Sequence, residues 1–439
     1  MKLFDFSLRF NGYQIDKAKR TLARIQEISN ADFETYIEDR KRDIVNHHLQ
    51  NNPYYRSLNQ NSSYNGWESV PVMTKRNLQQ PLKERLATGY KAKKVYVNKT
   101  SGSAGDPFIF AKDKWCHALT WAEIADRFSW YNIDYNRSCQ ARFYGIPLDK
   151  KGFYKERIKD YFSHRYRFSV FDLSDTAFKN CVAKFASTPF DYINGYTSPI
   201  VQFAKYLGRN NIVLKSVCPS LKVCMVTSEM LFPDDKKLME ARFGIPIVNE
   251  YGASELDLIA FQNPNGDWQL NSETLVVEIL DENNKILPNG QEGRVIITSL
   301  YNKAHPFIRY DIGDTGILSE DSTLKTPILK QLIGRTNDIA LLPSGKKAAG
   351  LTFYYITKSI IEDDGNVKEF IIEQMNLSHF KVSYVSHIPL SEHKIEIIKK
   401  EMENYLESGI DVTFERRDHL DRSKSGKLKQ FTSYIKASL

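Results

Sequence analysis

The chain has 439 residues, which exceeds what one compact core usually contains, so its length predicts two or three domains. Hydrophobic residues make up 41% and charged residues 26%, and the net charge of +8 is mild, which fits a packed interior beneath a polar surface. No apolar run of about 18 residues is present, which argues against a transmembrane helix. The N-terminus lacks the apolar core of a signal peptide, and five scattered cysteines form no CxxC pair. These features predict a cytoplasmic chain with neither a zinc site nor a disulfide framework.

Residues 1–90 are expected to be mostly helical. Apolar residues recur at near-helical spacing from Asp32 onward, and the pattern stops at Asn51-Asn52-Pro53. No catalytic constellation stands out in this region.

The sequence pattern changes between Val95 and about Thr298. In this region strand-like runs alternate with amphipathic helices, as is typical of an α/β fold. One helix is expected after Ser174, a suitable N-cap, and another from Pro233 to Phe243. The segment "LVVEILDENNKILPNGQEGRVIITSL" predicts a strand, a turn and a second strand.

The last hundred or so residues have the pattern of a separate small unit. "EFIIEQ", "FKVSYV" and "DVTFERR" predict strands, and a helix is expected after the N-cap Ser391, with Gly409 ending it. The boundary is placed at Gly334-Arg335. The predicted organisation is a large α/β domain with mixed sheets and helices, residues 1–334, followed by a small α+β domain, residues 335–439.

A loop rich in glycine and hydroxyl residues, "TSGSAGDP", lies between two apolar, β-branched runs. Its glycines, Gly102 and Gly105, would let backbone N–H groups approach an anion closely. Its hydroxyl donors are Thr100, Ser101 and Ser103. The P-loop of NTPases is excluded, because no Lys-Ser/Thr pair follows Gly105 and the next segment predicts a strand. Taken alone, the loop is compatible with a phosphate grip and with an ordinary hairpin turn.

Further segments combine glycines with polar residues. "NEYGASELDLIAFQ" follows an apolar strand and is expected to carry, on one short turn, Tyr251, Gly252 and Glu255. "PFIRYDIGDTG" offers, around a glycine, Arg309, Asp311 and Asp314. "LIGRTNDIALLPSGKK" opens the boundary region, and "DRSKSGKLKQF" places Lys427 in a basic loop. Each segment alone also fits a turn, a capping carboxylate or a solvated tail.

The order and spacing of these segments resemble the adenylate-forming superfamily of acyl-CoA synthetases and peptide-synthetase adenylation domains. Within it the chain is most similar to the phenylacetate–CoA ligase branch, particularly its CapK-like members linked to capsule and exopolysaccharide synthesis. The resemblance extends over nearly the whole chain, and "QEGRVIITSLYNKAHPFIRYDIGDTG" is its most specific piece. It implies a large adenylate-forming domain and a small C-terminal domain that swings between two half-reactions.

That resemblance implies an ATP-dependent ligase that forms an acyl-adenylate, releases pyrophosphate and passes the acyl group to an amine or a thiol. The loop residues Thr100, Ser101, Gly102, Ser103 and Gly105 would hold the β- and γ-phosphates. Tyr251 and Gly252 would lie at the adenine, Asp314 would bind the ribose hydroxyls, and Arg309 would complete the nucleotide site. Glu255 would hold Mg²⁺, a hard cation that prefers oxygen ligands. Arg335 would contact the ribose and phosphate, and Lys427 would bridge the acyl carboxylate and the α-phosphate.

Two positions depart from the family pattern. Many members have Gly-Arg-x-Asp at the domain hinge, whereas this chain has Gly-Arg-Thr-Asn-Asp, so the pivot is Asn337 or Asp338. Asp106 follows the phosphate loop, where a negative charge is unfavourable, and we expect its side chain to point away from the phosphates.

The acyl pocket is expected near "GYTSP" and "VTSEML", where the candidate residues are Tyr196, Thr197 and Ser228. Their hydroxyl groups suit a small or polar acid better than a long chain, although Tyr196 also fits a core position. The resemblance points to an amine acceptor such as an amino sugar or glycan precursor in surface-glycan biosynthesis. A phenylacetate-type acyl- or aryl-CoA ligase, which would use CoA, is the first alternative. A catalytically inactive acyl- or nucleotide-binding relative is the second.

The stretch from Lys150 to Phe168 interleaves basic and aromatic residues. The plainest interpretation is a solvated amphipathic helix and loop, and the alternative is contact with an anionic acceptor or a membrane surface. Nucleic acid is not expected, because no nucleic-acid motif accompanies the patch. If the stretch binds the acceptor, the basic residues involved would be Lys155, Arg157, Arg165 and Arg167.

Overall fold

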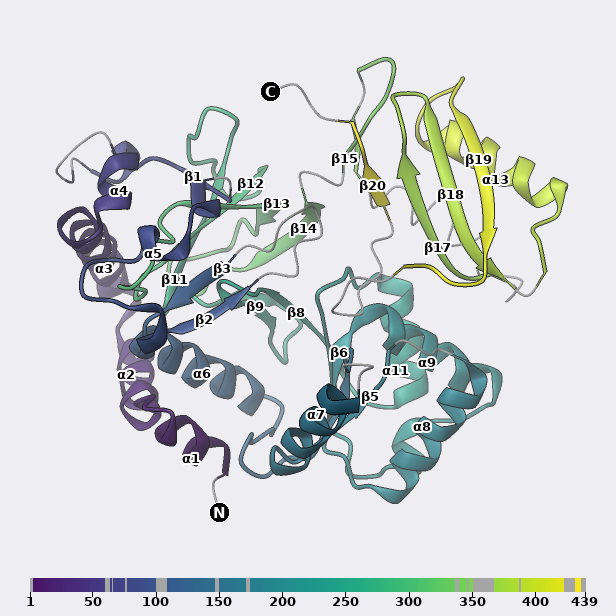
Figure 1. The fold of residues 1–439 in the computed structure, drawn as a ribbon, viewed down its shortest axis with the longest axis horizontal. Helices are drawn as coiled ribbons and strands as arrows, with labels where there is room; N and C mark the ends of the chain where they lie inside the picture. The colour runs from purple at the N-terminus through teal and green to yellow at the C-terminus, as the bar shows by residue number, and fades with distance from the viewer. Residues whose placement is uncertain are drawn as a thin grey trace. The chain divides into compact units, whose positions relative to one another are not determined.

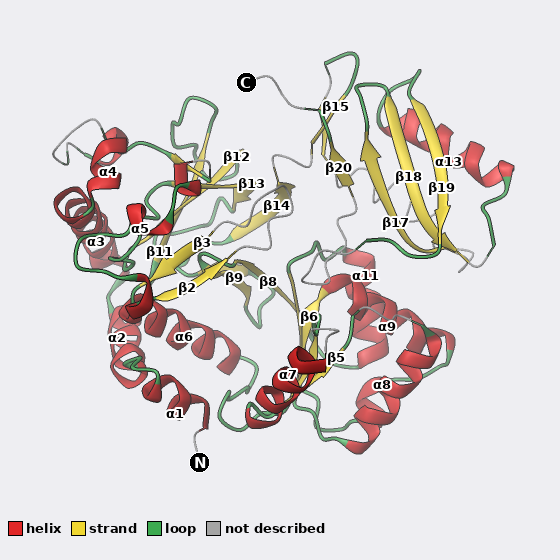
Figure 2. Cartoon of the chain, viewed as in Figure 1, coloured by secondary structure: helices red, strands yellow, loops and turns green. Residues whose placement is uncertain are grey.

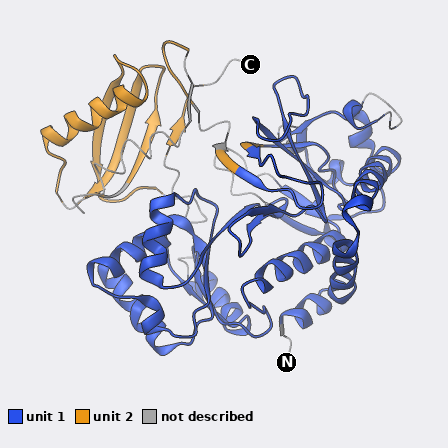
Figure 3. Cartoon of the chain, turned by 180° about the vertical axis from the view of Figure 1, so that it is seen from behind, with its two compact units in different colours: residues 1–312, 317–330 blue, residues 313–316, 331–439 orange. Residues whose placement is uncertain are grey.

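The chain forms two compact units, shown in different colours in Figure 3: residues 1–312 with 317–330, and residues 313–316 with 331–439. The computed structural model describes residues 3–59, 64, 66–75, 77–99, 109–146, 150–170, 174–335, 339–345, 347–349, 367–386, 388–421 and 431–435. The predicted mixed α/β class, with several sheets and packed helices, is confirmed. The chain passes from the first unit to the second between residues 330 and 331, a few residues before Gly334.

The N-terminal region is helical, as predicted. Its helices are α1 (Leu3–Phe10), α2 (Ile15–Glu27), α3 (Asn30–Asn51), α4 (Pro53–Leu58) and α5 (Leu82–Arg85), with 3₁₀ turns at Trp67–Ser69, Asn77–Gln79 and Ala92–Lys94. The break expected around Pro53 separates α3 from α4, because the Asn52 side chain caps α4 by accepting a hydrogen bond from the Tyr55 N–H. Pro53 then occupies the first turn of α4, where its missing N–H is tolerated.

A seven-stranded sheet dominates the first unit (Figures 1 and 2). Its spatial order is β10-β9-β8-β7-β6-β4-β5. The strands are β4 (Gln140–Phe143), β5 (Arg165–Phe168), β6 (Tyr192–Tyr196), β7 (Val223–Thr227), β8 (Ile247–Ala253), β9 (Asp257–Gln262) and β10 (Trp268–Leu270). β4 to β8 are parallel, and β9 and β10 are antiparallel additions at one edge. The helices along this part of the chain are α6 (Lys114–Ser129), α7 (Lys150–Phe162), α8 (Asp175–Ser187), α9 (Thr197–Arg209), α10 (Leu214–Val217) and α11 (Pro233–Phe243).

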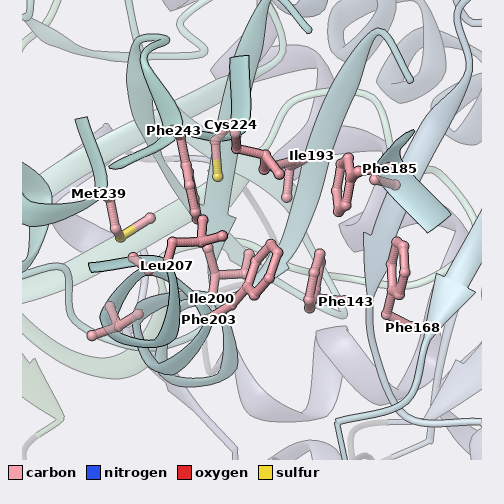
Figure 4. Close-up of a cluster of buried hydrophobic side chains, with 14 of the residues drawn as sticks. Phe143, Phe168, Phe185, Ile193, Ile200, Phe203, Leu207, Cys224, Met239 and Phe243 are labelled. Atoms are coloured by element: carbon pink, nitrogen blue, oxygen red, sulfur yellow. The ribbon is translucent and has the colours of Figure 1, made fainter. Parts of the chain in front are cut away.

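The two faces of this sheet pack differently. One face forms a phenylalanine-rich core against helices such as α8, α9 and α11, with Phe143, Phe185, Phe203 and Phe243 at its centre (Figure 4). The other face packs against α6 through a smaller cluster that includes Phe128. Because side chains alternate along a strand, successive residues of β4, β6, β7 and β8 belong to opposite faces.

The chain also forms a five-stranded sheet and a two-stranded hairpin. The sheet runs β1 (Met73–Thr74), β13 (Tyr310–Leu318), β12 (Glu292–Ser299) and β11 (Leu275–Leu280), with β14 (Leu329–Arg335) also paired to β13. The hairpin is the antiparallel pair β2 (Tyr96–Lys99) and β3 (Ile109–Lys112), which flanks the glycine-rich loop. The expected strand–loop–strand context is therefore present, and the loop itself, residues 100–108, lies outside the described residues.

The second unit has a core of its own. Its strands β17 (Val367–Gln374), β18 (His379–Ser386), β19 (Asp411–Arg417) and β20 (Phe431–Ser433) form a sheet in the order β19-β18-β17-β20 that packs against α13 (Glu392–Tyr405). β15 (Ile339–Leu341) and β16 (Lys347–Ala349) form a separate pair. The predicted strands are confirmed, and Ser391 caps α13 as expected by accepting from the Lys394 N–H. The helix ends at Tyr405 rather than at Gly409, whose φ of +83° places it in the turn before β19.

Candidate functional site

The carboxyl ends of the parallel strands bring candidate residues together. β5 and β6 lie on opposite sides of β4 in the sheet. The connection that follows β4 leads to β5 on one side, and the connection that follows β6 leads to β7 on the other side. In open α/β sheets, ligands bind where the strand order reverses, outside the carboxyl ends of the strands. Here that point lies between β4 and β6, where the Tyr144 and Tyr196 rings contact each other with centroids 4.5 Å apart.

Strand register aligns Tyr196, Thr227 and Glu250 across three neighbouring strands. Tyr196 of β6 is paired with Thr227 of β7, and Thr227 with Glu250 of β8. Two of the predicted pocket residues flank this row. Thr197 begins α9, and Ser228 follows β7 with an exposed side chain and a φ of +73°. The structure therefore brings the predicted residues Tyr196, Thr197 and Ser228 to one sheet edge.

The start of α9 is held by a carboxylate. Glu229 accepts hydrogen bonds from the Ser198 N–H at 2.7 Å and the Ser198 hydroxyl at 3.1 Å, and the Thr197 hydroxyl donates to the Glu229 carbonyl at 3.2 Å. A carboxylate at a helix N-terminus is favoured by the helix dipole. These contacts fix the segment after β7 against α9 and so hold Ser228 in position.

A layer of polar side chains lines the α6 side of these strands. None of the sequence motifs described above indicated this layer. We call Gln140, Arg142, Asn194, Thr227 and Glu250 the polar layer. Gln140 donates to Asn194 at 3.4 Å, and the Asn194 amide donates to the Met225 carbonyl at 3.4 Å. The available sequence signal was a charged residue near the end of two of these strands, Arg142 in "QARFY" and Glu250 in "IVNEY".

Glu250 gives the polar layer a carboxyl group with a strongly shifted pKa. Burial raises its pKa to about 7, while a hydrogen bond from Thr227 and the positive charge of Arg142 act in the opposite direction. Arg142 also lies over the Tyr144 ring, 4.2 Å from its centroid. Both protonation states of Glu250 are therefore populated near neutral pH, so this group can exchange a proton or hydrogen-bond with a polar ligand.

The β8–β9 hairpin carries the predicted adenine and metal residues. Tyr251 and Gly252 lie in β8 rather than on the short turn expected from the sequence, and only Glu255 lies on the turn. The strand continues because Tyr251 pairs with Ala260 and Gly252 with Leu258 of β9. Tyr251 is buried, with its ring 6.0 Å from that of Trp268.

Gly252 and Glu255 have clear local constraints. A Cβ on Gly252 would lie 2.6 Å from the Asp257 carbonyl oxygen, so only glycine fits this close approach. Glu255 is buried, and its Oε1 accepts a hydrogen bond of 2.9 Å from the Tyr310 hydroxyl. The hairpin is therefore shaped to hold one carboxylate in a fixed position.

An ion pair connects this hairpin to the strand that follows the glycine-rich loop. Lys112 of β3, whose side chain is 3% exposed, pairs with Asp257 at the start of β9. Asp257 has a φ of +58°, a conformation that aspartate tolerates better than most residues. The pair ties the base of the β2–β3 hairpin to the turn that carries Glu255.

Arg309, which the resemblance places in the nucleotide site, has internal partners on two segments of the chain. Its side chain is buried, donates to the Val70 carbonyl at 2.9 Å and lies 3.5 Å from the Glu278 carboxylate. These contacts connect the segment before β1 to β11, and the nucleotide contact expected of Arg309 stays a prediction. Glu278 could not be predicted as its partner, because the two residues lie in separate segments of the sequence.

The structure describes only some of the remaining predicted residues. Asp314 is buried in β13, beside Asp311, which pairs with Arg294 at 2.7 Å. Arg335 is the last residue of β14. The predicted phosphate loop with Asp106, the hinge residues Asn337 and Asp338, and Lys427 lie outside the described residues.

The basic stretch is arranged differently from the acceptor surface considered above. Arg165 and Arg167 pair with the buried Asp160 at 2.6 and 3.0 Å, and Arg157 donates to the Arg167 carbonyl at 2.8 Å. These three arginines hold α7 against β5, because their charges are satisfied within the fold. Of the four basic residues proposed for acceptor binding, Lys155 alone is exposed.

The donor set suits Mg²⁺ held together with a nucleotide. Mg²⁺ usually binds through one or two carboxylates, waters and substrate phosphates, and Glu255 supplies one fixed carboxylate. Across the part of the chain that the structure describes, no group of three or more His, Cys, Asp or Glu side chains converges. Within the same residues, no helix combines the length and the apolar character needed to cross a bilayer.

Several known proteins are similar to the chain. It is 22% identical to Protein CapK of Staphylococcus aureus over 347 residues, which cover 74% of this chain and 71% of that protein. It is 29% identical to the phenylacetate-coenzyme A ligase of Aromatoleum evansii over 131 residues, which cover 28% of this chain and 29% of the ligase. No family model matches.

Solved structures share the fold. The crystal structure of 2-hydroxyisobutyryl-CoA ligase in the postadenylation state matches with a TM-score of 0.68 and 16% identity, over 94% of this chain and 91% of that one. The amide bond synthetase McbA from Marinactinospora thermotolerans matches with a TM-score of 0.52 and 15% identity, over 76% of this chain and 68% of that one. With the relatives matched along the sequence, these likenesses confirm the predicted resemblance to the adenylate-forming superfamily and, within it, to the CapK-like proteins.

Proposed function

We propose that the protein is an ATP-dependent ligase that adenylates a carboxylic acid, releases pyrophosphate and transfers the acyl group to an amine or a thiol. The observation that carries this proposal is the convergence at one sheet edge. Tyr196, Thr197 and Ser228 lie at the carboxyl ends of β6 and β7, and the next strand leads into the hairpin that holds Glu255. Ligands of open α/β sheets bind at such an edge.

The first half-reaction needs charge neutralisation more than proton transfer, because a carboxylic acid is already ionised at pH 7. We propose that Glu255 holds Mg²⁺, which would neutralise phosphate charge. Lys427 would bridge the acid and the α-phosphate, and backbone N–H groups of residues 100–105 would hold the departing pyrophosphate. Asp314 would bind the ribose, and Arg335 the ribose and phosphate. The ion pair between Lys112 and Asp257 would hold the hairpin that flanks the glycine-rich loop close to the turn that carries Glu255.

The polar layer supports a polar acid as the substrate. Glu250 and Arg142 belong to the layer beside the predicted acyl pocket, and partly buried charges disfavour a purely hydrocarbon chain. An acid with an amino or hydroxyl group would hydrogen-bond to this layer. We therefore expect amino acids or hydroxy acids to be activated better than fatty acids.

For the acceptor, we propose an amine on a surface-glycan precursor, a role supported by similarity to CapK along most of the chain. Use of CoA is the alternative. It is favoured by the likeness to 2-hydroxyisobutyryl-CoA ligase, which has been solved with CoA bound. The amide bond synthetase shares the fold as well, so the fold accommodates both kinds of acceptor.

Adenylation can be tested by pyrophosphate release across amino acids, hydroxy acids, aryl acids and fatty acids. We expect release with a polar acid, and a fall of at least about 100-fold in Lys427→Ala, because a charge that stabilises the transition state is removed. Lys429→Ala is the matched control from the same basic loop and should change the rate by less than about twofold. Absence of release with every acid, or equal effects of the two substitutions, would contradict the proposal.

The acceptor can be identified in a second assay. Acyl-adenylate formed on the enzyme is challenged with CoA or with a panel of amino sugars, and the products are separated by mass spectrometry. An amide product supports the glycan role, whereas a thioester supports the CoA ligase. Release of neither product, despite adenylate formation, would contradict both acceptor assignments.

A further inference from the structure

Helix α7 is amphipathic in the opposite sense from an ordinary surface helix. Its acidic residues face inward, where Asp160 is 2% exposed and pairs with Arg165, and Glu156 accepts from Arg167 at 2.9 Å. Arg157 lies over the Tyr166 ring, 4.6 Å from its centroid. The inner face of α7 is therefore held by ion pairs, where hydrophobic contacts are usual.

The outer face carries the large apolar side chains. Tyr154 is 65% exposed, Ile158 59%, Tyr161 80% and Phe162 63%. Ile158 lies four residues after Tyr154, and Tyr161 and Phe162 follow Ile158 by three and four residues, so the four side chains form one stripe along the helix. The chain thus leaves four large apolar groups in water on a single helix, which is costly unless another apolar phase covers them.

Lysines run beside this stripe. Lys151, Lys155 and Lys159 are exposed and spaced by four residues, so they form a second row along the helix. Lys159 also pairs with Glu156 at 2.6 Å. We call the four apolar residues and the three lysines together the α7 outer face.

We propose that the α7 outer face docks on an anionic lipid bilayer. A helix with Tyr, Phe and Ile on one side and lysines alongside matches helices that lie in the plane of a membrane interface. Tyrosine and lysine each combine an apolar part with a polar tip that reaches the headgroups. A protein partner fits less well, because lysine is depleted from the cores of protein–protein interfaces. The proposal does not depend on the ligase activity, and it gives the enzyme a place beside lipid-linked substrates.

The test is co-sedimentation of the full-length protein with vesicles of phosphatidylcholine, alone or mixed with phosphatidylglycerol. We expect at least about tenfold tighter binding to the anionic vesicles, weakened by high salt because the lysines attract charged headgroups. A triple variant, Tyr154→Ser with Ile158→Ser and Phe162→Ser, should lose about tenfold or more in affinity. A second variant, with Lys151, Lys155 and Lys159 each replaced by Gln, should lose the preference for anionic vesicles.

The controls keep the result specific to α7. Phe10→Ser on α1 removes another exposed aromatic side chain, 82% exposed, and should leave vesicle binding unchanged. The urea midpoint of each variant should match that of the parent chain, because only exposed groups are altered. The proposal is overturned if no vesicle binds, or if Phe10→Ser weakens binding as much as the triple variant. It is also overturned if the protein forms a concentration-dependent dimer that Ile158→Ser abolishes, because a second copy would then cover this face.

Discussion

At the level of single residues, Glu250 and Arg309 show two ways in which the fold accommodates a charge. Arg309 is buried beside Glu278 and gives its hydrogen bonds to backbone carbonyls. Glu250, in contrast, accepts a hydrogen bond from Thr227 and lies near the positive charge of Arg142, but burial outweighs both and raises its pKa. A charge with internal partners stabilises packing, whereas a perturbed carboxyl at a sheet edge is a candidate for ligand contact.

The pKa of Glu250 leads to a pH-dependent prediction. A carboxyl whose pKa is raised by folding stabilises the protein below pH 4.5, and that contribution is lost as the pH rises through about 7. The full shift corresponds to at most about 3 kcal/mol, and we expect about 1–2 kcal/mol because the side chain is only partly buried. Glu250→Gln should therefore gain stability relative to the parent chain between pH 5 and pH 8, by about 1–2 kcal/mol.

Urea unfolding at a series of pH values measures this difference directly. Asn265→Gln, on an exposed turn, is the control, and its effect should not change over the same range because neither side chain is ionisable. A constant difference for Glu250→Gln would mean that the carboxyl titrates as it does in the unfolded chain. If Glu250 also contacts the acid substrate, the variant should raise KM for that acid while the urea midpoint at pH 5 stays close to that of the parent.

At the level of elements, the close packing within the β8–β9 hairpin leads to a prediction about activity. A methyl group on Gly252 would collide with the Asp257 carbonyl at 2.6 Å, so Gly252→Ala must displace the turn that carries Glu255. We expect pyrophosphate release to fall about 100-fold, because a misplacement of about 1 Å near reacting groups has effects of that size.

The matched control is Gly208→Ala in helix α9, where the added methyl would meet Arg242 at 3.4 Å, an ordinary contact. That variant should keep its activity and gain about 0.5–1 kcal/mol, because alanine favours a helix over glycine. Activity and urea midpoint are measured for both variants. Full activity in Gly252→Ala would show that the turn tolerates displacement.

The sequence predicted elements well where local chemistry determines them. Ser174 and Ser391 are N-caps, and both helices begin directly after them. Pro233 and Phe243 are the first and last residues of α11, as expected. The row that aligns Tyr196, Thr227 and Glu250 was not predicted, because parallel pairing joins residues far apart in the sequence and depends on the order of strands. The contact between Arg309 and Glu278 was not predicted for the same reason.

At the scale of the whole molecule, each unit has its own hydrophobic core. The first unit contains the phenylalanine-rich core around Phe203, and the second packs Phe380 and its neighbours against α13. Cores that are separate in this way usually unfold separately, so one free energy of unfolding would not describe the chain.

We predict two unfolding transitions that respond to different substitutions. Phe380→Ala should lower the stability of the second unit by about 3–5 kcal/mol and leave the first unchanged. Phe203→Ala should have the reverse effect, because both rings are fully buried in their own units. Hydrogen exchange followed by mass spectrometry over a urea series reports on each unit. A common shift of both transitions would show that the units unfold as one.

The alternation of side chains across the seven-stranded sheet has a consequence for how this enzyme can change over time. The polar layer and the phenylalanine-rich core are carried by the same strands but on opposite faces, as the neighbours Arg142 and Phe143 illustrate. If the polar layer contacts the acid as proposed, substitutions in it would alter the preferred acid without changing the phenylalanine-rich core that keeps the strands together. This separation allows a lineage to diversify its substrates while it conserves one scaffold, and it offers the same freedom to directed evolution.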